Sequence, residues 1–199
     1  GVAITESFNG TSWSEINDLN TARGEAGSVG LLTAGLVSGG APGSATTEAF
    51  NGTSFSEVND LNEGRQNFGM FGTSTSAIAA GGEAGTTADV ESWNGTSWTE
   101  IAELNTARDR AGGAGSSNSE GIVFGGTTDG GSTPVAITES WNGTAWTEVA
   151  DLATSRYGTS GTSGGTASPA AIASSGGDPV SAATEEWTLA NAIKTVALS

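Results

Sequence analysis

Nine charged residues recur in register along this chain of 199 residues, and their side chains are the first candidates for chemistry. An arginine fork can satisfy a carboxylate and backbone carbonyls together. Because a residue present in every repeat usually serves what every repeat needs, we predict one structural ion pair or hydrogen-bond set per repeat. The alternative is a ring of arginines that binds an anion on a shared axis. The residues are Glu6, Glu48, Glu91, Glu139 and Glu185, with Arg23, Arg65, Arg108 and Arg156.

A second set of acidic residues also recurs and could bind calcium. The two members of each pair are close in sequence, but they lack the clustered oxygen ligands of a known calcium loop. We therefore expect a solvated acidic rim and predict no metal site. The pairs are Glu15 with Asp18, Glu57 with Asp60, Glu100 with Glu103, and Glu148 with Asp151.

Composition excludes several classes of function. The chain has no cysteine and no histidine, which removes thiol chemistry, the usual general base and the commonest zinc and copper ligands. Its 22 acidic and 6 basic residues give a net charge of −16, which repels phosphate backbones and anionic lipids. No apolar run approaches the roughly 18 residues of a membrane span. We expect no cofactor, no nucleic-acid partner and no membrane insertion.

One enzyme hypothesis can be built from residue types alone. Sialidases combine an arginine cluster with a tyrosine nucleophile and carboxylates. Arg108, Asp109, Arg110, Arg156 and Tyr157 could take those roles, but they match only by residue type. We therefore predict no catalytic residues, and a glycosidase-type enzyme is the third hypothesis for function.

These side chains belong to a sequence that repeats. Residues 138–152 read "TESWNGTAWTEVADL", similar segments begin at residues 5, 47 and 90, and a degraded copy spans 184–198. Asn-Gly between two β-prone runs predicts a hairpin with an aromatic pair on one face. Asn-Gly-Thr is also a glycosylation sequon, but the turn alone explains both residues. The pairs are Phe8 with Trp13, Phe50 with Phe55, Trp93 with Trp98, and Trp141 with Trp146.

Between the hairpins, each repeat has an arginine followed by a glycine, and then an apolar run that ends in Gly-Gly. We predict a strand in each of these segments, so that every repeat has four strands. The spaced apolar residues after the second aromatic, Ile16 and Leu19 in the first copy, are interpreted as a strand that bends away rather than a helical turn. Periods of 42 to 48 residues indicate an all-β propeller. The predicted organisation is a half-blade at 3–19 and blades at about 23–61, 65–104, 108–152 and 156–199.

The order arginine, Gly-Gly, Glu-x-aromatic and Trp resembles the kelch repeat over essentially the whole chain. The resemblance implies four-stranded blades with the arginine strand nearest the central axis, although the aromatic spacing is shorter than in typical kelch repeats and tyrosine is scarce. Kelch propellers include galactose oxidase, but its copper site needs His, Tyr and a Tyr–Cys crosslink, so that chemistry cannot be carried over. "NGTSWTEIAELNTAR" is also similar to kelch-like repeats in predicted structural and tail proteins of tailed bacteriophages, notably marine ones.

The first hairpin has no arginine strand or Gly-Gly strand before it. Either these inner strands lie upstream of Gly1, or another subunit supplies them. We favour a fragment of a propeller with at least five blades. A chain that starts with glycine rather than methionine fits processing or a fragment.

Positions that differ between blades are the candidates for recognition, because loops on a rigid scaffold usually carry function. One group of these positions follows the recurring arginine, and the other follows the Gly-Gly pair. The kelch resemblance places the positions after the arginine near the mouth of the central channel. The longest variable loop, 127–136, is the best candidate contact surface, and the alternative is that these positions merely drift. The candidate binding residues are Gln66, Asn67, Phe68, Asp109, Arg110, Asp129 and Tyr157.

These observations predict a non-enzymatic structural and recognition protein in a virion or another extracellular setting. The leading hypothesis is a bacteriophage virion-surface or tail-appendage protein that contacts a host glycan or neighbouring virion subunits. The alternative is a secreted or surface bacterial adhesin or carbohydrate-binding module. Copurification with assembled particles would favour the virion, and a secretion signal would favour the adhesin.

Overall fold

The computed structural model describes residues 1–82, 86–131, 133–163, 170–174 and 184–188. This described part of the chain is all-β and contains no helix. Its strands form a two-stranded sheet (β1–β2), three four-stranded sheets (β3–β6, β7–β10 and β11–β14) and a three-stranded sheet (β15–β17). Each sheet is antiparallel with strands in chain order, so every connection within a sheet joins neighbouring strands. The first to fifth sheets are numbered below in this order.

The strand bounds place each sheet inside one predicted repeat. They are β1 Glu6–Phe8, β2 Trp13–Glu15, β3 Gly27–Leu31, β4 Ala34–Ser38, β5 Thr47–Phe50, β6 Phe55–Glu57, β7 Gly69–Thr73, β8 Ser76–Ala80, β9 Val90–Trp93, β10 Trp98–Glu100, β11 Gly112–Ser117, β12 Glu120–Phe124, β13 Thr138–Trp141, β14 Trp146–Glu148, β15 Ser160–Ser163, β16 Ala170–Ser174 and β17 Thr184–Thr188.

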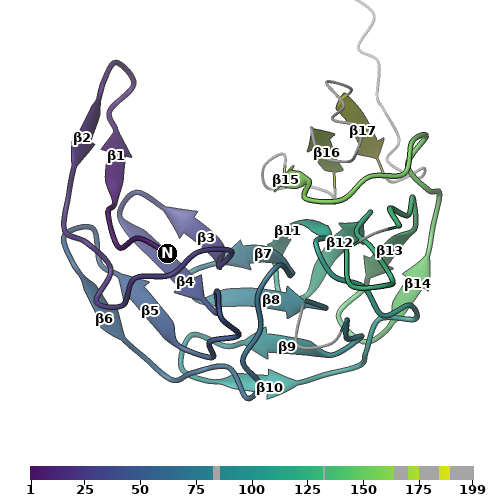
Figure 1. The fold of residues 1–199 in the computed structure, drawn as a ribbon, viewed down its shortest axis with the longest axis horizontal. Coiled ribbons are helices and arrows are strands. Elements are labelled where there is room, and N and C mark those ends of the chain that lie inside the picture. Colours follow the sequence, from purple (N-terminus) through teal and green to yellow (C-terminus); the bar gives the residue numbers. More distant parts are fainter. Residues whose placement is uncertain (83–85, 132, 164–169, 175–183, 189–199) are drawn as a thin grey trace, which may run out of the picture.

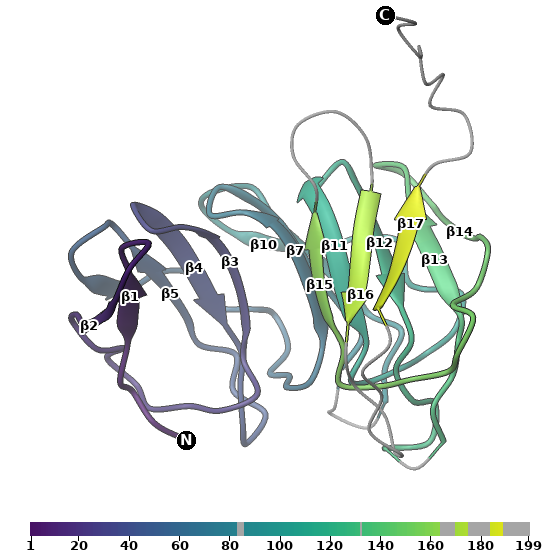
Figure 2. The ribbon, with the colours of Figure 1, turned by 90° about the horizontal axis from the view of Figure 1, so that it is seen from above.

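The sheets stand side by side in an open arc (Figure 1). The first strand of each four-stranded sheet lies on the concave side and the fourth lies on the convex side. Neighbouring sheets meet along these first strands, because β7 contacts both β3 and β11, and β11 contacts β15. Figure 2 shows the same sheets from above, with their strands roughly upright. The described sheets therefore surround part of an axis without closing a ring.

The Asn-Gly segments form the predicted hairpins. Asn51 Oδ1 accepts the N–H groups of Thr53 and Ser54 at 2.9 and 3.0 Å, while Gly52 takes a φ of 92° that favours glycine. Each first aromatic residue lies directly opposite the second in the strand register. Their ring centroids are 4.7 to 5.3 Å apart. The prediction of an aromatic pair on one face of each hairpin is confirmed.

The two aromatic residues of a hairpin pack in different directions. Trp93 covers its own sheet and donates its indole N–H to the Ser74 carbonyl at 3.0 Å. Trp98 reaches the preceding sheet and donates to Thr47 Oγ1 at 3.2 Å. In a chain with few aliphatic residues, the large aromatic side chains thus provide much of the buried apolar surface between sheets. The buried cluster between the second and third sheets contains Leu36, Leu61, Phe68, Ala77, Ala79, Trp93 and Trp98.

The second strand of each Asn-Gly hairpin (β2, β6, β10 and β14) is shorter than predicted, and the fourth strand predicted for the last repeat lies outside the described residues. In the first hairpin, Ile16 N–H donates to the Thr5 carbonyl and Leu19 N–H donates to the Ala3 carbonyl, although β2 has already ended. Between these two hydrogen bonds the chain advances three residues, from Ile16 to Leu19, while the opposite segment advances only two, from Thr5 to Ala3. The regular pairing of the two strands is therefore lost. The Asp18 side chain takes the Thr5 N–H instead, at 3.2 Å. The segment after the second aromatic is therefore an irregular extended segment and not a continued strand.

The strand predicted for each arginine segment forms, but it begins after the arginine, so the recurring arginines lie just outside the strands. Arg65, for example, precedes the start of β7 at Gly69. The arginine backbone is held by the Gly-Gly pair of the preceding sheet, since Gly82 N–H donates to the Arg108 carbonyl at 2.9 Å. The close approach needs glycine, because a Cβ on Gly81 would lie 2.4 Å from the same carbonyl.

We predict that Gly81→Ala destabilises the protein far more than Gly43→Ala. Both glycines have left-handed backbones, with φ of 69° and 65°, but a Cβ on Gly43 would meet nothing within 4 Å. Both variants carry the backbone cost of about 1 kcal/mol, and Gly81→Ala adds a steric cost of about 1–3 kcal/mol. Urea unfolding of the two variants measures the difference, and equal losses of stability would contradict the proposed contact between sheets.

Candidate recognition site at one end of the inner strands

The recurring arginines and glutamates form one buried ion pair within each sheet from the second to the fifth. Arg65 Nη2 lies 2.8 Å from Glu91 Oε1, and Arg65 Nη1 donates to the carbonyls of Gly81 and Asp89. The equivalent pairs are Arg23–Glu48, Arg108–Glu139 and Arg156–Glu185. Burial lowers the pKa of Arg108 from its ordinary value, and the charge and hydrogen bond of Glu139 oppose that shift.

A third recurring residue completes this network, and the sequence patterns considered above did not single it out. Asn62 lies in the connection from the second sheet to the third, and its backbone N–H and side-chain Nδ2 donate to Glu91 Oε2 at 2.7 and 2.8 Å. Asn20 and Asn105 do the same for Glu48 and Glu139. The signal was the dipeptide Leu-Asn, which stands three residues before three of the four arginines.

The four recurring arginines are all paired with glutamates in these networks. The four arginines are at most 5% exposed, and each guanidinium points to a carboxylate in its own sheet. This geometry favours the structural role over a ring of anion-binding arginines. Chemistry that distinguishes one sheet from another must therefore come from residues that do not repeat.

Non-repeating residues gather where the chain enters the inner strands. The second residue after each arginine has a left-handed backbone, with φ of 57° at Glu25, 54° at Asn67, 53° at Arg110 and 63° at Gly158. Asn67 N–H donates to the Glu25 carbonyl, Arg110 N–H to the Asn67 carbonyl, and Gly158 N–H to the Arg110 carbonyl. A continuous row of backbone hydrogen bonds thus links four successive sheets. We call these four residues the entry row.

The Arg110 side chain contacts several non-repeating residues beside the entry row. Its guanidinium lies over the Tyr157 ring, 5.8 Å from the centroid, and its Nε is 3.8 Å from Asp109 Oδ2. A Cβ on Gly131 would lie 2.4 Å from Arg110 Nη1, so the loop 127–136 contacts this side chain. The structure therefore brings Arg110, Tyr157 and the longest variable loop together. Nearby in the row, Asn67 Nδ2 donates to Glu25 Oε2 at 3.0 Å.

The other predicted binding residues have mainly structural contacts. Phe68 is 8% exposed and belongs to the cluster between sheets, so its ring is not at the surface. Asp109 is fully buried and accepts a hydrogen bond from the Thr127 hydroxyl. Gln66 Oε1 accepts the Gly43 N–H at 3.1 Å. Exposed Asp129 accepts the backbone N–H and the hydroxyl of Thr133, which shapes the variable loop.

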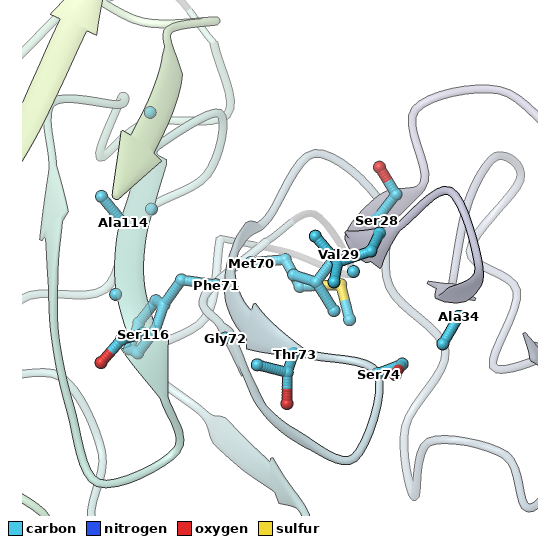
Figure 3. Close-up of a pocket in the computed structure, with 15 residues that line it drawn as sticks. Ser28, Val29, Ala34, Met70, Phe71, Gly72, Thr73, Ser74, Ala114 and Ser116 are labelled. Carbon is cyan, nitrogen blue, oxygen red and sulfur yellow. The ribbon is translucent and has the colours of Figure 1, made fainter. Parts of the chain in front are cut away.

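A cavity of about 590 Å³ follows the concave side of the arc. It is lined by the inner strands β3, β7, β11 and β15, and none of its lining residues is charged. Figure 3 shows Val29 and Met70 from adjacent inner strands, with Phe71 and Ser116 farther along the wall. Glycines account for several of the lining positions, so much of the wall is backbone. This surface offers apolar contact and peptide groups rather than a catalytic group.

Comparisons with known proteins give no assignment. No protein-family model matches the chain, and no curated protein matches it either. Within the described ranges, no helix is long and apolar enough to cross a membrane, and no cluster of three or more acidic residues could hold a metal ion. The function is therefore inferred from the geometry of the chain itself.

We predict that Glu139→Gln costs about 3–5 kcal/mol of unfolding free energy, because it leaves Arg108 buried without its counter-charge. Glu148 is the matched control. It lies directly opposite Glu139 in the strand register, but it is exposed, so Glu148→Gln changes stability by about 0.5 kcal/mol or less. Chemical denaturation measures the stability of both variants. Arg108→Ala is expected to lower the unfolding temperature, because it leaves the buried Glu139 carboxylate without its counter-charge. Similar losses for the two glutamine variants would refute the role of the pair.

Among the described residues, the network of the fifth sheet lacks the asparagine side chain found in the other three. Ala153 replaces the asparagine found in the other connections, so Glu185 Oε2 receives its backbone N–H without a side-chain amide. The Glu185 side chain is 22% exposed, whereas the glutamates of the three four-stranded sheets are fully buried.

We predict that Ala153→Asn stabilises the fifth sheet by about 1 kcal/mol, the usual value of one added hydrogen bond. Amide hydrogen exchange of β17 provides the measurement, because it reports on opening of this sheet alone. Ala150→Asn adds an amide at another exposed position and serves as the control. Equal protection of β17 in the two variants would show that the asparagine contributes nothing here.

Proposed function

We propose that this chain forms a kelch-like β-propeller scaffold and works as a non-enzymatic structural and recognition protein. The propeller assignment is supported by the open arc of antiparallel sheets, whose first strands meet on the concave side. It is supported equally by the repeated joint in which a Gly-Gly pair holds the arginine backbone of the next sheet. Further sheets of the same kind would continue the arc toward a closed ring.

The observation that carries the recognition role is the convergence of non-repeating residues at one end of the inner strands. Arg110, Tyr157 and the loop 127–136 come from two different sheets and meet above the entry row. From the second sheet to the fifth, in contrast, the repeated arginines and glutamates pair with each other in one network per sheet. A rigid frame with a variable surface at one end is the usual design of a recognition protein.

The proposed ligand is a host-surface glycan. The Tyr157 ring can stack on a sugar ring, and the Arg110 guanidinium and the Asn67 amide can donate hydrogen bonds to sugar hydroxyl groups. The net charge of −16 disfavours polyanionic ligands, which supports a neutral or weakly charged saccharide. The virion or extracellular setting is part of this proposal and rests on the resemblance of the repeat to those of phage structural and tail proteins. In an assembled particle, many copies would strengthen a weak single site through avidity.

The test is binding of the full chain to an array of bacterial surface glycans. We expect Arg110→Gln to weaken binding by about tenfold or more, because a charge-assisted hydrogen bond is replaced by a neutral one. Tyr157→Ala should have a similar effect through loss of the stacking surface. Thr144→Ala alters an exposed hairpin turn instead and should leave binding unchanged. If the glycan binds both site variants as tightly as the parent protein, the proposed site is wrong.

A further inference from the structure

Asp109 is a buried charge that the repeated frame does not need. Four carboxylates are buried among the described residues, and three of them are the glutamates of the four-stranded sheets. The fourth is Asp109, which directly follows Arg108. At the same position, the other repeats have Gly24, Gln66 and Tyr157. Because burying a charge is costly and the other sheets form without one here, this carboxylate serves something particular to the fourth sheet.

The Asp109 carboxylate is also incompletely satisfied. Its Oδ1 accepts a hydrogen bond from the Thr127 hydroxyl, but its Oδ2 is buried and receives none from the described residues. Glu91, in contrast, receives hydrogen bonds at both of its oxygens. Native proteins keep few buried polar atoms without a partner, and those that persist are expected at functional sites.

The carboxylate is not required to hold the variable loop. Asp109 N–H donates to the Thr127 carbonyl at 3.0 Å, and Thr127 N–H donates to the Asp109 carbonyl at 2.9 Å. These backbone hydrogen bonds anchor the start of the loop 127–136 whatever side chain stands at residue 109. In the second sheet, Ala41 N–H donates to the Gly24 carbonyl at 2.7 Å, so a glycine is enough for this kind of contact.

The carboxylate faces the Arg110 guanidinium. Arg110 Nε lies 3.8 Å from Asp109 Oδ2, the oxygen without a hydrogen bond. The guanidinium also lies against Gly131, where a Cβ would be 2.4 Å from Nη1, and over Tyr157, 5.8 Å from the ring centroid. Three segments of the chain thus surround a long side chain that is still 30% exposed. Of these three contacts, the one from Asp109 carries the opposite charge.

We propose that Asp109 is a positioning residue for the recognition site. It does not touch the ligand, because its side chain is fully buried. Its charge holds the Arg110 guanidinium in one orientation over Tyr157 before a ligand arrives, so that binding has to order less of the Arg110 side chain. This inference rests on the proposed glycan site and names the residue that prepares it. A buried charge retained for function at some expense of stability is a common pattern at binding sites.

Asp109→Asn separates this role from a structural one, because it keeps the shape of the side chain and the acceptor for Thr127 but removes the charge. The NMR order parameter of the Arg110 Nε–H bond, measured without ligand, should be high in the parent chain. In the variant it should fall below about 0.6, the range of flexible groups. The urea midpoint should not fall, because the change removes a partly satisfied buried charge while Arg110 keeps its contact with water.

Thr127→Val makes the opposite change, since it removes the hydrogen-bond donor but leaves the Asp109 charge in place. It should lower the urea midpoint and keep the Arg110 Nε–H bond ordered. An order parameter that is low in the parent chain, or unchanged in Asp109→Asn, would overturn the proposal. A urea midpoint that falls as far in Asp109→Asn as in Thr127→Val would show that the carboxylate is structural.

Glycan binding by the full chain adds a double-mutant cycle. The probe is each immobilised saccharide of the bacterial surface array that binds the parent chain. Asp109→Asn should weaken this binding by about threefold to tenfold, the usual cost of ordering one long side chain. In the Arg110→Gln background it should have no further effect, because Asp109 acts through Arg110. Glu100→Gln removes the same charge from an exposed position on β10 and is the control. Equal weakening by Asp109→Asn in both backgrounds, or by Asp109→Asn and Glu100→Gln, contradicts the proposal.

The two proposals can fail separately. If the parent chain binds no glycan, the proposed function is wrong, and the order parameter still decides whether Asp109 holds Arg110. If Arg110→Gln weakens glycan binding but Asp109→Asn does not, the glycan site stands and the positioning role is wrong.

Discussion

The structure depends on burying one carboxylate in each four-stranded sheet without leaving it unsatisfied. A buried charge is costly unless it is paired and fully hydrogen-bonded. Glu91 meets that condition through the Arg65 guanidinium, the Asn62 side chain and the backbone N–H groups of Asn62 and Glu63. The arginine belongs to the same sheet, and the asparagine lies in the connection from the preceding one. A single glutamate therefore fixes its own sheet, the arginine loop and the joint between two sheets.

The second requirement is close approach between sheets that have little aliphatic material. Gly113 faces the Met70 backbone, where a Cβ would lie 3.0 Å from Met70 N, and Gly121 lies under the Phe71 ring. Small residues on one sheet thus receive aromatic or backbone atoms of the next. The abundance of glycine and alanine does not indicate a disordered chain, because these residues leave space that large rings fill. The aromatic pairs and the glycine-rich strands work as one packing system.

The parts of this structure that sequence predicted best are those with local physical causes. Asn-Gly sets the hairpin register within a few residues, so the pairing of Phe50 with Phe55 followed directly. The pairing of arginine with glutamate needed only their recurrence in phase. The asparagine donors were missed because the Leu-Asn dipeptide, although it recurs, predicts no local structure by itself, and its role appears only when two sheets come together. The burial of Phe68 was missed for a similar reason, since a variable position can still pack between sheets.

The candidate site was only partly visible in sequence. Variation between repeats drew attention to Arg110, Tyr157 and the loop 127–136, and in the structure these lie together. It could not separate surface residues from Asp109, whose carboxylate is buried against the Thr127 hydroxyl. Variation along a repeat shows that a position is not needed by every sheet. It does not show whether the side chain faces solvent, because that depends on the twist of the chain after the arginine.

The joint between a Gly-Gly pair and the next arginine has a consequence for how such a chain can change over time. Gly40, Gly82 and Gly126 each donate to the carbonyl of the following arginine, so these three joints share the same hydrogen bond. A gene duplication that adds one whole repeat would insert a sheet with two matching joints and would disturb neither neighbour. A deletion of one whole repeat would be tolerated in the same way. The number of sheets in the arc can thus change by one at a time, while the residues beside the entry row change independently in each sheet.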